Sequence, residues 1–149
     1  MSPAAAAQLS AALTRCRQQR MPLSLSLLEF DVLANRNIRD RENSLAPWFS
    51  AIRRAVTSRG NSLCLEVAHH RLAVIFENAD RSELVEWSRD LIHWWTLETA
   101  GDVAVLSVGV GTIGVSGKHF GAGDLVAAAT RCLDASHASG GSVVKSIEI

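Results

Sequence analysis

An α+β fold with a mostly antiparallel central sheet is predicted by two properties of the sequence. Segments with the alternating apolar pattern of strands are interleaved with segments that have the three- and four-residue apolar spacing of helices. Turn-forming or helix-breaking residues separate most of these segments, so the connections are short. The resulting order is α-β-α-β-β-α-β-α-β, and we expect the helices to cover one face of the sheet.

The first two elements are a helix over residues 4–19 and a strand over residues 23–31. The helix has apolar residues at helical spacing, and Met21-Pro22 ends it. Its apolar stripe comprises Leu9, Ala12, Leu13 and Cys16. The strand begins with a strict alternation of leucine and serine over residues 23–27, which predicts a strand at the centre of the sheet.

A helix and a hairpin follow the polar stretch 35–43. The helix is predicted near 44–58 from an apolar stripe at helical spacing, and residues 59–61 form a turn. The stripe comprises Leu45, Trp48, Phe49, Ile52 and Val56. Two strands, 63–67 and 72–76, flank a tight connection at residues 68–71 and are predicted to pair as a hairpin.

The last helices and strands are marked by caps and glycines. Asp80 and Glu83 have the spacing of a capping box, so a helix is expected from there to about residue 97. The segment 103–111 alternates and is predicted to be a strand, with a glycine-containing loop after it. A helix over 125–138 is closed by Gly140-Gly141 and leads to a final strand over 142–149. The middle of this order, βαββαβ, is the ferredoxin-like split unit.

Size, charge and cysteine content narrow the class of protein. The 149 residues are the length of one domain, and 48% of them are apolar, enough to form a core. The 15 basic and 15 acidic residues cancel, which argues against nucleic acid or an anionic membrane as a partner. The sequence has no transmembrane-length apolar run and no signal peptide. The three cysteines are far apart among apolar residues, which predicts reduced, structural thiols and a cytoplasmic location.

Four short stretches resemble the GGDEF domain, the fold of the diguanylate cyclases, and the resemblance covers nearly the whole chain from about residue 5. They are residues 27–33, the hairpin around 66–75, residues 106–110 and residues 128–140. In the family the hairpin reads Arg-Tyr-Gly-Gly-Asp-Glu-Phe-Ala-Val-Leu. The resemblance therefore identifies residues 1–149 as a single degenerate GGDEF-like domain with an N-terminal helix over 1–20.

The resemblance implies a chemistry that this chain no longer carries. Family members hold two metal ions through carboxylates, and these ions neutralise a triphosphate and activate a ribose hydroxyl. Glu29 keeps a carboxylate at the first metal position, but Arg71 replaces the second one, and a guanidinium cannot bind a cation. The rest of the signature turn is Ala68, His69 and His70. Ala34 and His137 stand where the family has phosphate-binding lysines. We expect no catalytic residues.

Some residues keep vestiges of a nucleotide site. Asn37 matches the family's base-reading asparagine, and Arg59 is the arginine of an Arg-x-x-Asp inhibitory site whose acid is here Ser62. Glu29 and Asp31 alternate along a strand and share a face, so they are the pair that could hold Mg²⁺. No other cofactor is expected. Nucleotide binding remains an open alternative.

Two further patterns have competing interpretations. His69-His70 is a metal pair only if the turn brings both rings together, because neighbours on a strand point to opposite faces; a solvated turn is the simpler interpretation. Gly109-x-Gly111-x-x-Gly114 fits a dinucleotide fingerprint but is followed by a loop rather than a helix, so we give it little weight.

Three tryptophans on the predicted helix after Asp80 indicate an interaction surface. Its apolar residues cover a wider arc than one sheet face requires, so Trp87 or Trp94 is expected to be partly exposed in the isolated chain. The resulting hypothesis is a catalytically inactive regulatory or protein-interaction module in bacterial signalling, with a protein partner or a homodimer. The alternatives are a sensor that binds GTP or cyclic di-GMP without turnover, and an active nucleotidyl cyclase with a rebuilt site.

Overall fold

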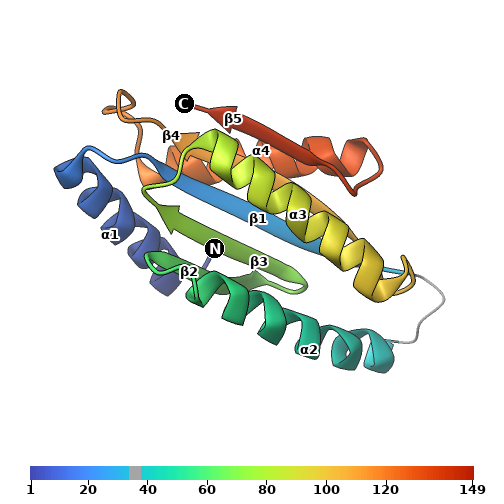
Figure 1. The fold of residues 1–149 in the computed structure, drawn as a ribbon. Helices are drawn as coiled ribbons and strands as arrows, with labels where there is room; N and C mark the ends of the chain where they lie inside the picture. The colour runs from blue at the N-terminus through green and yellow to red at the C-terminus, as the bar shows by residue number, and fades with distance from the viewer. Residues whose placement is uncertain (34–37) are drawn as a thin grey trace.

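The computed structural model describes the backbone of residues 1–33 and 38–149 and the side chains of residues 1–33 and 45–149. The predicted order of helices and strands is confirmed (Figure 1). The elements are α1 (Pro3–Gln19), β1 (Leu23–Val32), α2 (Ile38–Thr57), β2 (Ser62–Ala68), β3 (Arg71–Glu77), α3 (Arg81–Thr99), β4 (Ala104–Ile113), α4 (Ala122–Ala138) and β5 (Val144–Glu148).

The strands form one five-stranded sheet in the order β2-β3-β1-β4-β5. β1 lies at its centre, as the sequence predicts, and pairs antiparallel with both β3 and β4. β2 and β3 form the predicted hairpin. The pairing of β4 with β5 is parallel, so the sheet is mixed but mostly antiparallel.

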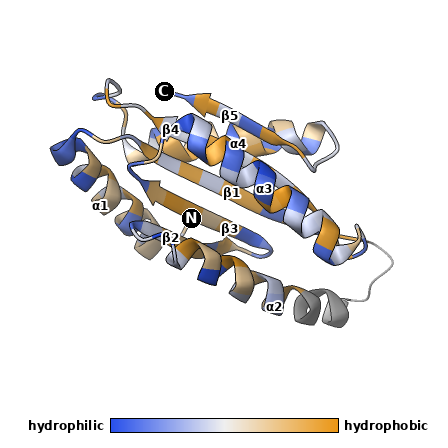
Figure 2. Cartoon of the chain, viewed as in Figure 1, coloured by the Kyte–Doolittle hydropathy of each residue, from blue (hydrophilic) through white to orange (hydrophobic). Residues whose placement is uncertain are grey.

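The helices cover both faces of the sheet, so the prediction of a single covered face is wrong. One core cluster packs residues of α2 and α3 against the sheet, and the second packs α1 and α4 against the opposite face. Figure 1 shows α2 and α3 on the near side and α1 and α4 behind. Apolar residues line the strands between the two layers (Figure 2).

The cause of this error is the leucine–serine alternation of β1, which does not separate an inner from an outer face. Ser24 and Ser26 are fully buried, although serine usually marks a solvated position. The Ser24 hydroxyl lies 2.8 Å from the Ala79 carbonyl oxygen and 2.7 Å from the Thr112 hydroxyl. Ser26 pairs with Ser88 of α3 at 3.3 Å. These bonds satisfy the hydroxyls and allow a second helical layer to cover them.

α2 begins at Ile38, earlier than the predicted start near residue 44. The stretch 39–42 reads Arg-Asp-Arg-Glu, which has no apolar stripe, so its helical periodicity is invisible in the sequence. Pro47 lies inside α2, although proline is more usual in the first turn of a helix.

The glycines of β4 serve helix packing. A Cβ on Gly109 would lie 2.2 Å from the Leu133 nitrogen and 2.4 Å from the Ala129 carbonyl oxygen, both in the backbone of α4. Gly111 also faces α4, with the Ala129 nitrogen 3.1 Å from its Cβ position. The fingerprint-like glycine pattern is therefore explained by the close approach of a helix to a strand.

The remaining sequence predictions concern the thiols and the membrane. Cys16, Cys64 and Cys132 are free and buried, as expected. Burial raises the pKa of each of these thiols above its ordinary value, which makes them poor nucleophiles. Among the helices that the structure describes, none is sufficiently long and apolar to cross a bilayer.

Candidate functional site

The signature turn joins β2 to β3 and is closed by His69 and His70. His70 adopts a left-handed backbone with φ 57°, and its carbonyl oxygen accepts a hydrogen bond of 2.9 Å from the Phe30 amide of β1. The two imidazole rings stack at 3.8 Å between centroids. The turn therefore places both rings together rather than on opposite faces. Even so, the described residues contain no group of three or more histidine, cysteine or acidic side chains that could hold a metal ion.

Glu29 is the centre of a polar cluster to which four elements contribute. In the sheet it pairs with Arg71 of β3 on one side and with Ser107 of β4 on the other. Arg71 Nη2 lies 3.1 Å from Glu29 Oε2, and His137 Nε2 of α4 lies 2.5 Å from the same oxygen. His137 Nδ1 in turn lies 3.4 Å from the Ser107 hydroxyl.

The cluster is partly shielded from water, since the side chains of Glu29, Arg71 and His137 are 25%, 31% and 35% exposed. Burial alone would raise the pKa of Glu29. The hydrogen bond from His137 and the charge of Arg71 together outweigh burial, so the pKa of Glu29 lies below its ordinary value. Glu29 is therefore a carboxylate at neutral pH, with two nitrogen donors on a single oxygen.

These residues do not fit a magnesium site. A divalent ion bound to Glu29 would have to displace the Arg71 guanidinium or share the carboxylate with it, and two positive charges at such a distance repel. Asp31, the other candidate ligand, lies two residues further along β1 and is exposed. A single exposed acid does not replace the missing carboxylate at position 71.

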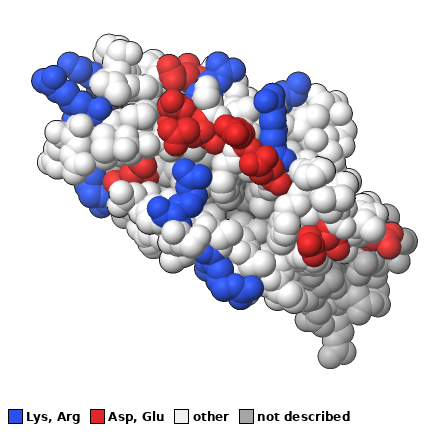
Figure 3. Space-filling view, in the orientation of Figure 1, with Lys and Arg blue, Asp and Glu red and all other residues white. Residues whose placement is uncertain are grey.

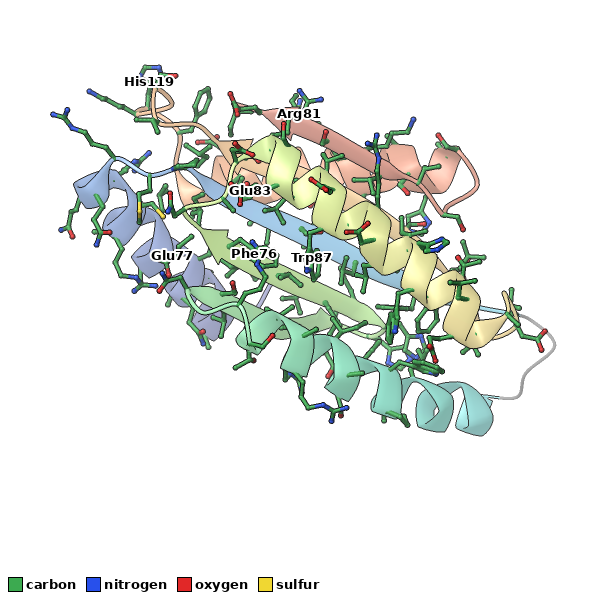
Figure 4. The ribbon with its side chains drawn as sticks, viewed as in Figure 1. Phe76, Glu77, Arg81, Glu83, Trp87 and His119 are labelled. Carbon is green, nitrogen blue, oxygen red and sulfur yellow. The ribbon has the colours of Figure 1, made fainter. Side chains whose placement is uncertain are left out.

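Arg59 ends up beside the tryptophan helix. Its guanidinium lies 4.7 Å from the centroid of the Phe76 ring, and it forms an ion pair of 3.8 Å with Glu83. Phe76 also packs against Trp87, with ring centroids 5.0 Å apart. Phe76, Glu83 and Trp87 are labelled in Figure 4. The structure thus brings two sequence-predicted residues, Arg59 and Trp87, onto one face, on the opposite side of the sheet from Glu29.

The three tryptophans of α3 differ in burial. Trp95 is buried and donates a hydrogen bond of 2.9 Å from Nε1 to the Ala104 carbonyl oxygen. Trp87 and Trp94 are both half-buried, which confirms the expected partial exposure. They line a groove of about 240 Å³ between α2 and α3. Its lining residues are Ala51, Ile52, Ala55, Trp87, Asp90, Leu91 and Trp94.

A cavity that no sequence motif indicated lies at the far end of the sheet from Glu29. It measures about 800 Å³ and has buried apolar residues of α1 and the strand ends at its base. The charged residues around it are Arg17, Arg20, Lys118, Asp80 and Glu148. Because bases and acids are mixed there, the cavity does not select a ligand by charge.

Three further predicted positions are Ala34, Asn37 and His137. Asn37 lies outside the described residues, as does Ala34. His137, expected only as a lost lysine, becomes the second donor to Glu29 from a position 108 residues away. Nothing in a single sequence pairs such distant positions, although the resemblance already placed both at one site.

Solved structures with a similar fold are GGDEF domains. One is the active GGEEF domain of a diguanylate cyclase from Vibrio cholerae, with a TM-score of 0.78, 15% identity and coverage of 94% of this chain and 92% of that one. Another is the GGDEF domain of DgcB from Caulobacter crescentus in complex with c-di-GMP, with a TM-score of 0.68, 12% identity and coverage of 93% and 83%.

A third similar structure is diguanylate cyclase SiaD from Pseudomonas aeruginosa in complex with its activator SiaC, with a TM-score of 0.64, 15% identity and coverage of 94% of this chain and 55% of that one. No protein-family model and no curated protein sequence matches this chain. At these identities the similarity establishes the fold, and function has to be argued from the site.

Proposed function

We propose that this chain, which has the fold of the GGDEF domains of diguanylate cyclases, is a catalytically silent regulatory or protein-interaction module in bacterial cyclic di-GMP signalling. The fold supports a place in that signalling system. The state of the Glu29 carboxylate supports catalytic silence. The complex of SiaD with its activator is a precedent for protein partners of this fold.

The observation that carries the proposal is the internal pairing of Glu29 with Arg71 and His137. In a cyclase of this family, a metal ion would neutralise the carboxylate at this position and would also polarise the phosphates. Here the guanidinium and the imidazole occupy the lone pairs of Glu29 Oε2. Charge at Glu29 is therefore balanced within the protein, and a metal ion at this carboxylate would have to compete with the guanidinium and the imidazole.

The test is incubation of the purified chain with GTP and either Mg²⁺ or Mn²⁺, followed by chromatography. We expect no cyclic di-GMP, because the loss of metal and phosphate contacts lowers the reaction rate by on the order of 10³-fold or more. An active GGEEF domain such as that of Vibrio cholerae serves as the positive control. Metal-dependent product that disappears in Glu29→Ala would overturn the proposal and favour a cyclase with a rebuilt site.

A second candidate function is a sensor that binds a guanine nucleotide without turnover. The observation that favours it is Arg59, whose side chain is 40% exposed and whose guanidinium carbon lies over the Phe76 ring, 4.7 Å from its centroid. Such a cation can stack on a purine or pair with a phosphate. Calorimetric titration of GTP and of cyclic di-GMP tests this candidate. Heat of binding that is lost in Arg59→Ala but retained in Arg54→Ala would establish the sensor, and no heat with either nucleotide would exclude it.

A further inference from the structure

The groove between α2 and α3 has the properties of a surface that another protein covers. On its α3 side it presents Trp87 and Trp94, and on its α2 side the small residues Ala51 and Ala55. Leu97, on the same side of α3, is 67% exposed, the highest value among the exposed large apolar side chains of the described residues. Large apolar side chains beside small ones form ridges and grooves against which another helix can pack.

The two half-buried tryptophans are held in fixed positions before any partner arrives. Trp87 packs edge-on against Phe76, and Trp94 packs edge-on against Trp48 at 5.7 Å between centroids. Figure 4 shows Trp87 in the space between α3 and α2. Rigid aromatic side chains lose little conformational entropy on binding, which is why tryptophan is enriched at the energetic centres of interfaces.

The outward edges of the two helices carry opposite charges. Exposed Glu86 and Asp90 lie on α3, and on the face seen in Figure 3 acidic side chains gather over this helix. Arg89 follows Trp87 by two residues, and at about 3.6 residues per turn this places its side chain on the opposite side of α3, off this face. On α2, the exposed Arg54 lies about 180° from the buried Leu45, and the segment 45–57 contains no acid.

Arg54 and Asp90 are at the same level along the groove. The two helices run antiparallel, since Arg59 meets Glu83 at one end and Trp48 meets Trp94 towards the other. Asp90 lines the groove together with Ala51 and Ala55, which lie three residues before and one residue after Arg54. Among the described side chains, no ion pair joins Arg54 to Asp90.

We propose that the groove between α2 and α3 is the contact surface of a symmetric dimer of this chain, in which α2 of each protomer packs on α3 of the other. A two-fold axis parallel to the groove places α2 of one protomer opposite α3 of its partner. Each residue keeps its position along the length of the groove. Arg54 of one protomer then meets Asp90 of its partner, twice. An axis across the groove would instead place the acidic edge of α3 against itself, which is repulsive.

The size of the surface sets the concentration at which the dimer forms. Two helices, each about 28 Å long and about 10 Å wide, offer roughly 560 Å² per protomer. This is below the roughly 800 Å² per partner of a standard stable interface, so the dimer is reversible and requires high protein concentration. The inference rests on the proposed role as an interaction module and identifies its partner as a second copy of the chain.

Sedimentation equilibrium up to millimolar protein tests the dimer with two charge reversals. Arg54→Glu and Asp90→Arg each place like charges at both symmetric contacts, so each alone should dimerise at least roughly tenfold more weakly than the wild type. An equimolar mixture of the two variants should regain association, because both contacts are then complementary. Circular dichroism verifies that each variant is folded.

Arg53→Glu is the matched control. Arg53 lies next to Arg54 but lines a different hollow, together with Glu66 and His69 of the hairpin, so its reversal should leave dimerisation unchanged. A wild type that stays monomeric, or folded variants whose mixture does not associate, would overturn the inference. GTP turnover in the same samples separates the two proposals: a monomer without turnover refutes only the dimer, and a dimer with turnover refutes only catalytic silence.

Discussion

Glu29 accepts contacts from Arg71 and His137 at one oxygen, so protonating or removing the carboxylate breaks both at once. Its pKa is lowered on folding, and the contribution of the ionised form to stability is therefore complete above the ordinary value of about 4.5. That contribution is lost as the pH falls through the lower pKa of the folded protein. The lowered pKa of Glu29 therefore makes the folded protein less stable as the pH becomes acidic.

The first prediction concerns Glu29→Gln and pH. At neutral pH the wild type should be more stable to urea than the variant, and the difference should shrink as the pH is lowered from about 5 towards 3, because the wild type alone loses the carboxylate. Asp31→Asn, which removes an exposed carboxylate from the same strand, is the control. A stability difference that is constant across this range would contradict the role given to Glu29.

The second prediction concerns Arg71→Glu, which places two carboxylates on register partners of β1 and β3. Without divalent metal the variant should lose roughly 1–2 kcal/mol of stability, because like charges face one another across the strands. Millimolar Mg²⁺ or Mn²⁺ should raise its melting temperature but leave that of the wild type unchanged. Equal responses of the two proteins to metal would show that Arg71 does not exclude the cation.

The third prediction concerns the left-handed backbone of His70. With φ at 57°, glycine suits the position better than alanine, so His70→Gly should be more stable than His70→Ala by about 1 kcal/mol. The same two substitutions at His69, which has no positive φ, should show no preference for glycine. Urea unfolding of the four variants measures both differences. Equal stabilities at position 70 would exclude a left-handed turn.

At the scale of the elements, the sequence predicted where strands and helices lie better than it predicted which faces of the sheet the helices cover. Apolar periodicity, helix caps and glycines together predicted the five strands and four helices of the described residues, because core contacts enforce periodicity along each segment. Periodicity did not show that buried serines such as Ser24 and Ser26 allow β1 to be covered on both faces, since their hydrogen-bond partners lie on distant segments. The early start of α2 was missed for a related reason, because its charged first turns carry no apolar signal.

The fourth prediction uses the contact between α4 and β4. Gly109→Ala should destabilise the protein by roughly 3 kcal/mol or more, because its Cβ would lie 2.2 Å from a backbone nitrogen that moves only with the whole helix. Gly123→Ala, within α4 with open space around it, should instead stabilise by about 0.5–1 kcal/mol. Urea unfolding compares the two. Equal tolerance at both positions would refute the close packing of α4 on β4.

At the scale of the whole molecule, the resemblance predicts which residues belong to a site, and the tertiary structure shows which of them are in contact. Position 29 was identified as a vestigial ligand and position 137 as a lost lysine, but their mutual contact depends on α4 crossing behind β1 and β4. Arg59 and Trp87 were assigned to different functions, and the packing of α2 beside α3 placed them on one face. A single sequence contains the residue types but not these adjacencies.

The last prediction concerns cooperativity between the two helical layers. All four tryptophans belong to or pack against the α2/α3 cluster, so their fluorescence reports on that layer alone, whereas far-ultraviolet circular dichroism reports on every helix. Leu9 of α1 is fully buried in the other cluster, and Leu9→Ala should cost about 2–5 kcal/mol. Because β1 and β3 contribute residues to both clusters, the fluorescence midpoint should fall as far as the circular dichroism midpoint in urea. A fluorescence midpoint that stays at the wild-type value while the circular dichroism midpoint falls would show that the layers unfold separately and that the sheet does not couple them.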